Sequence, residues 1–308
     1  MQKIIFILLL ALTSLSYSQK KKLEAKDAYF GLTPPGIIPE VFAPGIVCDS
    51  TWREHCQVAI SPNGDEIFWS KFADGETEQI YFSKFTNNKW TKPELADFIK
   101  EDLTLINGQP TFSSDGNKLF FYSRNRPGGL GYIDAWYVER KDDRWSKPIN
   151  VGEPFNTDGD DRPPIITEKG NAYTMGRTFT ENKVDYLKFS YTDGMFSSPS
   201  TVHTYKKTPY WWPLYISPTE SYIIFPSALK EGFGRLDLYI CFKDDSDKWG
   251  KPINLGPEIN TKLSERFPVV SPDGKYLFFM RHTETWDIFW VSTDIFKELK
   301  PKKIIGLK

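Results

Sequence analysis

Short apolar stretches that begin directly after a polar turn recur five times along the chain. In each case a Ser or Thr opens the turn, and an apolar run follows at once, as in EIFWS, KLFFYS and KYLFFM. The five turns begin, in steps of 52, 54, 50 and 54 residues, at Ser61, Ser113, Thr167, Ser217 and Ser271. A Pro- and Gly-containing turn between short apolar runs predicts a β-hairpin. A period of this length predicts that each repeat is a whole supersecondary unit.

Two further strands are predicted in each unit. An acid introduces an alternating run about 15 residues after the turn, at Asp134, Asp185, Asp237 and Asp287, whereas the first unit has Glu78 and Gln79 there. An aromatic residue and a proline then mark a fourth strand: Trp90 and Pro93, Trp145 and Pro148, Phe196 and Pro199, Trp249 and Pro252. Four short strands per unit are typical of a propeller blade. The repeated Trp is interpreted as packing between neighbouring sheets, and Phe120, Phe121, Phe278 and Phe279 as core residues.

The fourth strand of the fifth unit is expected at the front of the chain. Pro39 lies 22 residues before Ser61, and the other four prolines precede the next turn by 18 to 20 residues. Pairing of this segment with the last unit would remove exposed sheet edges. We therefore predict an all-β fold: a five-bladed β-propeller of four-stranded antiparallel blades, closed by the N-terminal segment pairing with the last blade.

The domain organisation follows from the same pattern. Residues 1–18 carry Lys3 and the apolar run IIFILLLAL, which is the layout of a signal peptide and is too short for a membrane span of about 20 residues. Residues 19–36 are expected to be a flexible lead-in, and 37–300 a single propeller. The predicted blades are about 54–100, 107–152, 160–205, 210–256, and 265–300 together with 37–47. A periplasmic or secreted protein is expected.

Charge and cysteine content narrow the function classes. The formal net charge is −1, and removal of the leader with Lys3 makes it −2, so neither nucleic acid nor an anionic membrane is an expected partner. Cys48 and Cys56 are eight residues apart, which permits a disulfide in an oxidising compartment but equally two buried thiols. Cys241 is expected to be an inert strand residue. No phosphate loop, dinucleotide fingerprint or nucleophile elbow occurs, so no cofactor is expected.

Two segments carry a family resemblance. RPGGLGYIDAWYVERKDDRWSKPINVG (126–152) and WGKPINLGPEINTKLSERFPVVSPDGKYLFF (249–279) resemble the WD-repeat-like propeller repeats of the TolB type, found in exported bacterial proteins, many from the Bacteroidetes. The resemblance covers roughly residues 37–293 and is weakest in units three and four. It implies a propeller in the periplasm or outside the cell, and it implies no reaction.

Charged residues are predicted to gather at one mouth of the central channel. Glu54, Asp161 with Asp160, and Glu265 precede the first strands of their units, and Lys71, Arg177, Arg281 and Arg124 end the second strands. Hairpin geometry predicts Glu54 opposite Lys71, Asp161 opposite Arg177, and Glu265 opposite Arg281. These pairs either neutralise and hydrogen-bond one another at the blade ends, without a ligand, or surround a polar ligand.

The run Trp211–Trp212 departs from the repeat at the same position. Strand alternation sends one of the two rings toward the channel and the other into the sheet interior. A ring facing the channel would stack on a sugar or on an apolar side chain of a partner, whereas core packing is the alternative.

Two functions remain open. The favoured hypothesis is an exported non-catalytic recognition or scaffold module that binds a protein partner or a cell-envelope glycan or other polymer at this mouth. The alternative is a carbohydrate-active enzyme with the channel carboxylates Asp161, Glu265 and Glu54, whose neighbouring cations are expected to lower their pKa values. Asp158 and Asp160 are weak calcium candidates that lack the twelve-residue loop pattern, and a solvated loop is the favoured interpretation.

Overall fold

A computed structural model describes residues 22–24, 27–48, 53–72, 75–178, 183–206 and 213–300. For residues 54–56, 177–178, 183–184 and 203–206 the structure describes the backbone but not the side chains. The predicted signal peptide, residues 1–18, lies outside the described residues. Nearly all regular structure is β-strand.

The strands follow the repeat. Unit one contains β2 (Arg53–Ile60), β3 (Glu66–Phe72), β4 (Glu78–Thr86), β5 (Lys89–Trp90), β6 (Glu94–Leu95) and the 3-10 helix η2 (Asp97–Ile99). Unit two contains β7 (Asn107–Phe112), β8 (Lys118–Arg124), β9 (Ile133–Lys141), β10 (Arg144–Trp145) and β11 (Ile149–Asn150). Unit three contains β12 (Asp160–Asp161), β13 (Ile165–Ile166), β14 (Asn171–Thr178), β15 (Lys183–Thr192), β16 (Met195–Phe196) and β17 (Ser200–Lys206).

Units four and five are shorter. Unit four contains β18 (Tyr215–Ile216), β19 (Tyr222–Ser227), β20 (Asp237–Phe242) and β21 (Ile253–Asn254). Unit five contains β22 (Glu265–Val270), β23 (Tyr276–Arg281), β24 (Ile288–Ser292) and the helix α1 (Ile295–Leu299), which the repeat pattern did not predict. The 3-10 helix η1 (Tyr29–Gly31) and β1 (Glu40–Val41) precede the first unit.

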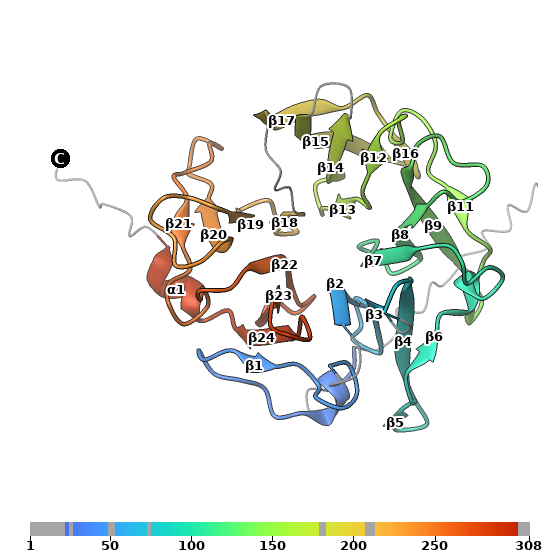
Figure 1. Ribbon diagram of the computed structural model, residues 1–308, viewed down its shortest axis with the longest axis horizontal. Coiled ribbons are helices and arrows are strands. Elements are labelled where there is room, and N and C mark those ends of the chain that lie inside the picture. The colour runs from blue at the N-terminus through green and yellow to red at the C-terminus, as the bar shows by residue number, and fades with distance from the viewer. Residues whose placement is uncertain are drawn as a thin grey trace, which may run out of the picture.

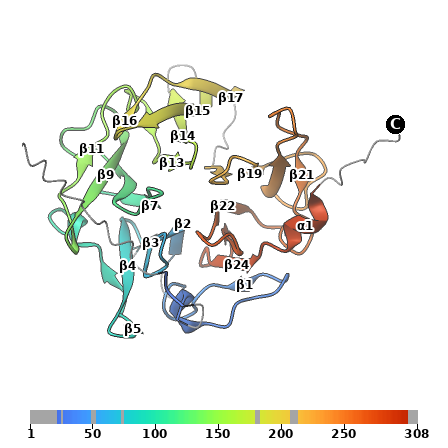
Figure 2. The same cartoon turned by 180° about the vertical axis from the view of Figure 1, so that it is seen from behind.

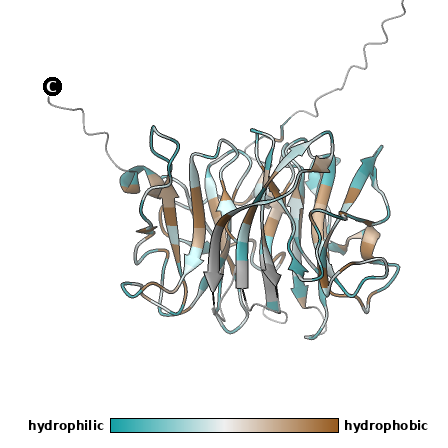
Figure 3. Ribbon diagram, turned by 90° about the horizontal axis from the view of Figure 1, so that it is seen from above, coloured by the Kyte–Doolittle hydropathy of each residue, from teal (hydrophilic) through white to brown (hydrophobic). Residues whose placement is uncertain are grey.

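The sheets stand around a central axis, and β2, β7, β13, β18 and β22 are the innermost strands (Figures 1 and 2). Seen from the side, the strands run between two faces made of loops and turns (Figure 3). The sheets contain four, eleven, four and five strands. The eleven-stranded sheet differs from the predicted four-stranded blade because one parallel bridge, Asp160 to Ile133, joins unit three to unit two. Small outer hairpins such as β9–β10 add further strands.

The recurring Ser or Thr has a local structural role in every unit. Its side-chain oxygen accepts a hydrogen bond from the backbone N–H where the second strand begins, at 2.9 Å from Glu66 to Ser61 and 3.0 Å from Tyr276 to Ser271. The corresponding bonds of the other three turns have distances of 2.9, 3.3 and 3.1 Å. Four of the turns contain a glycine at positive φ, but unit four has Glu220 there, with a φ of 57°. The hydroxyl therefore holds the hairpin turn closed in all five units.

A buried hydrogen-bond network explains the repeated acid, the Pro-Ile-Asn sequence and the Asn-Thr pair. Asp237 accepts hydrogen bonds from the backbone of Phe233 and Gly234 and from Asn254, at 2.6, 2.9 and 2.9 Å. The Asn254 carbonyl oxygen accepts from Asn260 at 2.8 Å, and the Asn260 amide bonds both backbone groups of Leu238 at 2.7 and 3.0 Å.

The same network recurs in unit two. Asp134, Asn150 and Asn156 take the places of Asp237, Asn254 and Asn260, and Asn156 bonds both backbone groups of Ala135. The loop before the acid requires glycine, because a Cβ at Gly234 would come within 2.1 Å of the Leu263 carbonyl oxygen. The network fixes the start of the third strand against the connection to the next unit.

The cores lie between neighbouring units, as predicted. Phe120, Phe121, Phe278 and Phe279 are each at most 1% exposed. The ring of Trp145 in unit two packs at 6.2 Å, between centroids, against Phe68 of unit one. The repeated aromatic residue is therefore a packing residue between sheets.

The N-terminal segment packs on the last unit. β1 pairs antiparallel with β24, with Glu40 opposite Trp290, and Pro39 lies directly before β1 as the other prolines lie before their fourth strands. Phe42 is fully buried and its ring centroid lies 5.2 Å from that of Trp290. Tyr29, inside the predicted flexible lead-in, is 7% exposed and joins the same core cluster.

Candidate functional site

The central channel has two chemically different ends. We call the end at which the innermost strands begin the polar mouth; its described residues include Arg53, Lys71, Arg124, Asp161, Arg235, Glu265, Arg266, Arg281, His282 and Trp286. We call the space between the same strands near the Ser-Pro turns the turn-end cavity. The sequence analysis predicted a site at the polar mouth and did not predict the turn-end cavity.

Two of the acids predicted for the polar mouth, Asp161 and Glu265, are buried. Asp161 is 2% exposed and Glu265 is not exposed at all. Asp161 Oδ2 accepts hydrogen bonds from the backbone N–H and the hydroxyl of Thr157, at 2.6 and 2.9 Å. Glu265 Oε1 accepts from Thr261 Oγ1 at 2.7 Å and from Arg281 Nε at 3.0 Å. Each acid therefore continues the buried network of the preceding unit and ties it to the next.

The strand register confirms two predicted pairs and corrects the third. Glu54 lies opposite Lys71, and Glu265 lies opposite Arg281. The prediction of Asp161 opposite Arg177 is wrong, because Asp160 lies opposite Arg177 and Asp161 lies opposite Gly176.

The physical reason is the length of the turn. In unit three the backbone bond that closes the turn joins Thr167 to Asn171, four residues on. In unit five the equivalent bond joins Ser271 to Tyr276, five residues on. Counting residues from the turn therefore misplaces the register of unit three by one.

The predicted direction of the pKa shift is also wrong for Asp161 and Glu265, whereas the Glu54 side chain lies outside the described residues. Burial raises the pKa of Asp161 to about 6, and it outweighs the two hydrogen bonds from Thr157. Burial likewise raises the pKa of Glu265, despite its bonds to Thr261 and the charge of Arg281. Desolvation of a carboxylate disfavours its charged form, and here it is the largest effect.

Cationic and aromatic groups gather at the polar mouth around Trp286. The Arg53 guanidinium lies 5.5 Å from the centre of the Trp286 ring, and His282 meets that ring edge-on at 4.8 Å. Arg266 Nη2 lies 3.1 Å from His282 Nδ1, which must be the acceptor because a guanidinium only donates. Burial and the charge of Arg235 lower the pKa of Arg266 to about 10. Burial and the arginine charges lower the pKa of His282.

The predicted site residues Lys71 and Arg124 each lie against an aromatic ring. Lys71 is 8% exposed, and its ammonium lies 4.6 Å from the centre of the Tyr81 ring. The Arg124 guanidinium lies 5.1 Å from the ring of Tyr132, which is 45% exposed. Trp211 and Trp212 lie outside the described residues, as do the side chains of Glu54 and Arg177.

The calcium and cysteine candidates are also placed. Asp158 is exposed and Asp160 is buried, and no group of three or more His, Cys, Asp or Glu side chains suited to a metal ion occurs among the described residues. The Cys48 thiol is buried against the backbone of Ile288, and the Cys56 side chain lies outside the description, so their disulfide stays untested. Cys241 is buried, which raises its pKa to about 11.

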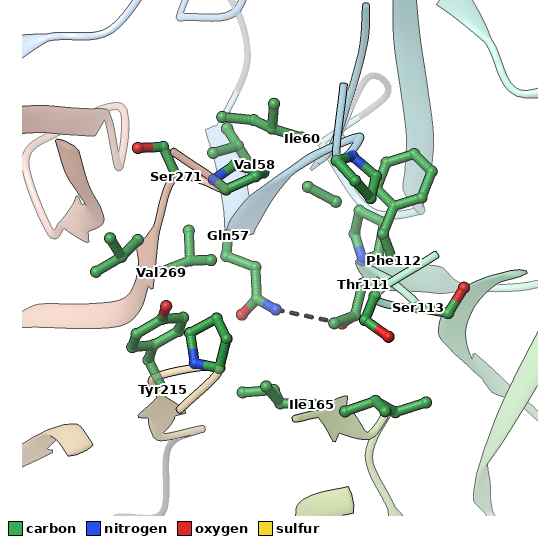
Figure 4. Close-up of a pocket in the computed structure, with 18 of the residues that line it drawn as sticks. Gln57, Val58, Ile60, Thr111, Phe112, Ser113, Ile165, Tyr215, Val269 and Ser271 are labelled. Carbon is green, nitrogen blue, oxygen red and sulfur yellow. Dashed lines mark hydrogen bonds between the residues drawn. The ribbon is translucent and has the colours of Figure 1, made fainter. Parts of the chain in front are cut away.

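Sequence reasoning missed the turn-end cavity. It has a volume of about 230 Å³, and all five units line it (Figure 4). Gln57, Val58, Phe112, Ile165, Tyr215 and Val269 surround its interior. The available signal was the apolar pair that precedes four of the five turns, such as Val269 and Val270, which had been interpreted only as part of the hairpin strand. In the described ranges no helix is both long and apolar enough to span a membrane.

Comparisons with known proteins show similar folds at low identity. No protein-family model matches the chain, and no curated protein matches it in sequence. TolB from Acinetobacter baumannii is 13% identical with a TM-score of 0.46, over 79% of this chain and 55% of that protein, so this chain spans little more than half of its length.

Two similar solved structures are named as enzymes. A thermostable family-43 glycoside hydrolase is 12% identical, with a TM-score of 0.47 over 84% of this chain and 90% of that one. The Hadza microbial sialidase Hz136 is 10% identical, with a TM-score of 0.47 over 79% and 66%. These similar proteins have different activities, and none is close enough to transfer an activity.

Proposed function

We propose that the chain is a closed five-bladed β-propeller that is exported to the periplasm or beyond the cell. Five sequence repeats and the pairing of β1 with β24 support the blade count and the closure. The lead sequence with Lys3 and its apolar run supports export.

We further propose that it is a non-catalytic recognition module that binds acidic groups of a partner protein or cell-envelope polymer at the polar mouth. The observation that carries this proposal is the grouping of the exposed Arg53 with the half-buried Trp286 and His282, the latter bonded by the buried Arg266. Guanidinium groups bind carboxylates and sulfates through paired hydrogen bonds, and an aromatic ring adds contact area. A local cationic group of this kind acts at short range even though the net charge is −1.

The buried acids favour binding over glycoside cleavage. A catalytic carboxylate must reach the sugar or its attacking water. Asp161 and Glu265 instead accept hydrogen bonds from Thr157 and Thr261 inside the protein and have almost no exposed surface. Their arrangement supports a structural role.

Binding to polymers of defined charge tests the proposal. The mature protein should retard on immobilised polygalacturonate and heparin but not on neutral dextran, and salt should release it. Replacing Arg53 by Glu together with Trp286 by Ala should abolish retention. The matched control is Arg144→Glu, an exposed arginine on the outer hairpin strand β10.

Partner proteins are tested by the same variants. An envelope protein captured by the parent and by Arg144→Glu, but not by the double variant, would place the partner at the polar mouth. Equal capture of partners and polymers by all three proteins would refute the proposed site, and measurable cleavage of a glycan would refute the non-catalytic function.

A further inference from the structure

The turn-end cavity is large enough for one small apolar group. Its volume is about 230 Å³. An engineered apolar cavity of roughly 150 Å³ binds benzene, and drug-sized ligands usually occupy roughly 300 Å³ or more. The cavity therefore suits a ring or a short alkyl chain with a few additional atoms.

Apolar side chains make up much of the cavity lining, and the Gln57 amide also reaches into the cavity (Figure 4). Val58, Phe112, Ile165 and Val269 come from four different units and face the same space (Figure 4). A side-chain hydrogen bond with Tyr222 engages the Tyr215 hydroxyl.

Two of the lining hydroxyls, those of Ser113 and Ser271, donate hydrogen bonds within their own turns. Ser113 donates to Asp115, and Ser271 donates to Asp273, each at 2.6 Å. Within the cavity, Gln57 Nε2 donates to Thr111 Oγ1 at 3.4 Å (Figure 4). An apolar group that enters the cavity can therefore lose its contact with water without breaking these hydrogen bonds.

One residue gives the entrance a charge. The lining residues that directly follow the turn Ser or Thr are Pro62, Ser114, Glu168, Pro218 and Pro272. Among them Glu168 alone is ionisable, and it is exposed. Its backbone N–H donates to the Pro218 carbonyl at 3.0 Å, which holds its turn against the next unit.

The neighbouring Lys169 is exposed and is not among the residues that line the cavity. Lys169 acts on Asp247, whose pKa is lowered first by its bond to Lys243 and further by the charge of Lys169. Asp273, in another turn of this face, has the Lys275 ammonium 3.9 Å away, whereas the described lining itself holds no cation and only one carboxylate, that of Glu168. A positive charge at the entrance is therefore favoured over a negative one.

We propose that the turn-end cavity is a binding site for a small organic cation, an aryl or alkyl amine whose apolar part enters the cavity while its ammonium group faces Glu168. This site is separate from the polar mouth, has the opposite charge preference, and does not rest on the function proposed for that mouth. The apolar part supplies burial, and the carboxylate supplies selectivity.

Three probes of similar size and different charge test this proposal. Calorimetric titration of the mature protein should show saturable binding of benzylamine, about 2- to 5-fold weaker binding of benzyl alcohol, and the weakest binding of benzoate. This 2- to 5-fold difference in affinity between the amine and the alcohol is what one solvent-exposed ion pair contributes. Glu168→Gln should remove the preference for the amine over the alcohol, whereas Glu258→Gln, an exposed acid away from the cavity lining, should retain it.

Filling the cavity provides an independent readout. Val269→Phe and Ile165→Trp place bulk in the same space from two different units, and either one should abolish binding of both benzylamine and benzyl alcohol. Two variants are used so that the test survives if one of them fails to fold. Variants of Arg53 and Trp286 should bind benzylamine like the parent, which separates this site from the polar mouth.

Two results would overturn the proposal. One is the absence of saturable benzylamine binding to the folded parent protein. The other is unchanged benzylamine binding in a folded variant that fills the cavity, which would place the amine elsewhere on the surface.

Discussion

Replacing Asn260 by Ala should remove a large part of the protein's stability. Asn260 is 1% exposed and bonds the N–H and the carbonyl of Leu238, a residue with no exposed surface. Water therefore cannot replace the lost partners. Asn260 also donates to Asn254, and Asn254 in turn donates to Asp237, the acid that opens the third strand.

The magnitude follows from what each partner loses. The Leu238 N–H loses its acceptor at 2.7 Å, and a buried unsatisfied group costs about 1–3 kcal/mol. The Leu238 carbonyl still accepts from Leu255, and Asn254 still accepts from Gly256, so those two bonds cost only about 0.5–1.5 kcal/mol each. The free energy of unfolding should fall by about 2–6 kcal/mol, which lowers the thermal midpoint by at least about 3 °C in a chain of this size.

Urea unfolding followed by tryptophan fluorescence, together with a thermal scan, measures this loss. Asn156→Ala should cause a similar loss, because Asn156 makes the matching bonds to Ala135 in unit two. Glu258→Ala, an exposed change two residues from Asn260, should stay within about 0.5 kcal/mol of the parent. A parent-like midpoint for Asn260→Ala, or a loss in only one of the two asparagine variants, would refute the equivalence of the two networks.

Three further changes test single features. Burial raises the pKa of Asp161 to about 6, so its protonated form favours folding, and this contribution to stability is lost as the pH rises from about 4 through 6. Asp161→Asn should therefore raise the urea midpoint at pH 8 but not at pH 4. Equal shifts at both pH values would contradict burial as the cause of the raised pKa. Glu220→Gly relieves a positive φ worth about 1 kcal/mol but loses the bonds from Thr167 and Asn171, so a net loss of about 1–4 kcal/mol is expected in the same assay, and a gain would show that strain dominates. Phe42→Ala should cost about 3–5 kcal/mol if β1 closes the ring, and an unchanged midpoint would rule out that contribution.

The features that depend on local chemistry could be predicted from the sequence. The Ser and Thr turns and the strands after them were located correctly because one hydroxyl and a few turn residues determine a hairpin. The position of Pro39 gave the pairing of β1 with the last unit because the prolines occupy one place in every repeat. The packing role of Trp145 followed from its recurrence.

The features that depend on distant chain segments were missed or placed wrongly. Asp161 was assigned the wrong opposite residue because one residue of turn length shifts a register, and turn length could not be read from Thr-Glu-Lys-Gly. The pKa values of Asp161 and Glu265 are raised because both side chains are buried, and burial could not be read from the sequence. Counting neighbouring charges, such as that of Arg281 beside Glu265, gave the opposite direction. The turn-end cavity required five strands from five units to be brought together, and none of the five showed it alone.

The pairing of β1 with β24 also bears on the order in which the chain can fold. Cys48 contacts Ile288 across 240 residues of sequence, so this contact cannot form until almost the whole chain has been made. Contacts between such distant segments form slowly because a long loop must close first. During synthesis Phe42 must therefore stay without its partners Phe278 and Trp290 while the first four units emerge. The pairing of β1 with β24 is therefore among the last contacts that the growing chain can make, whatever the earlier units have already formed.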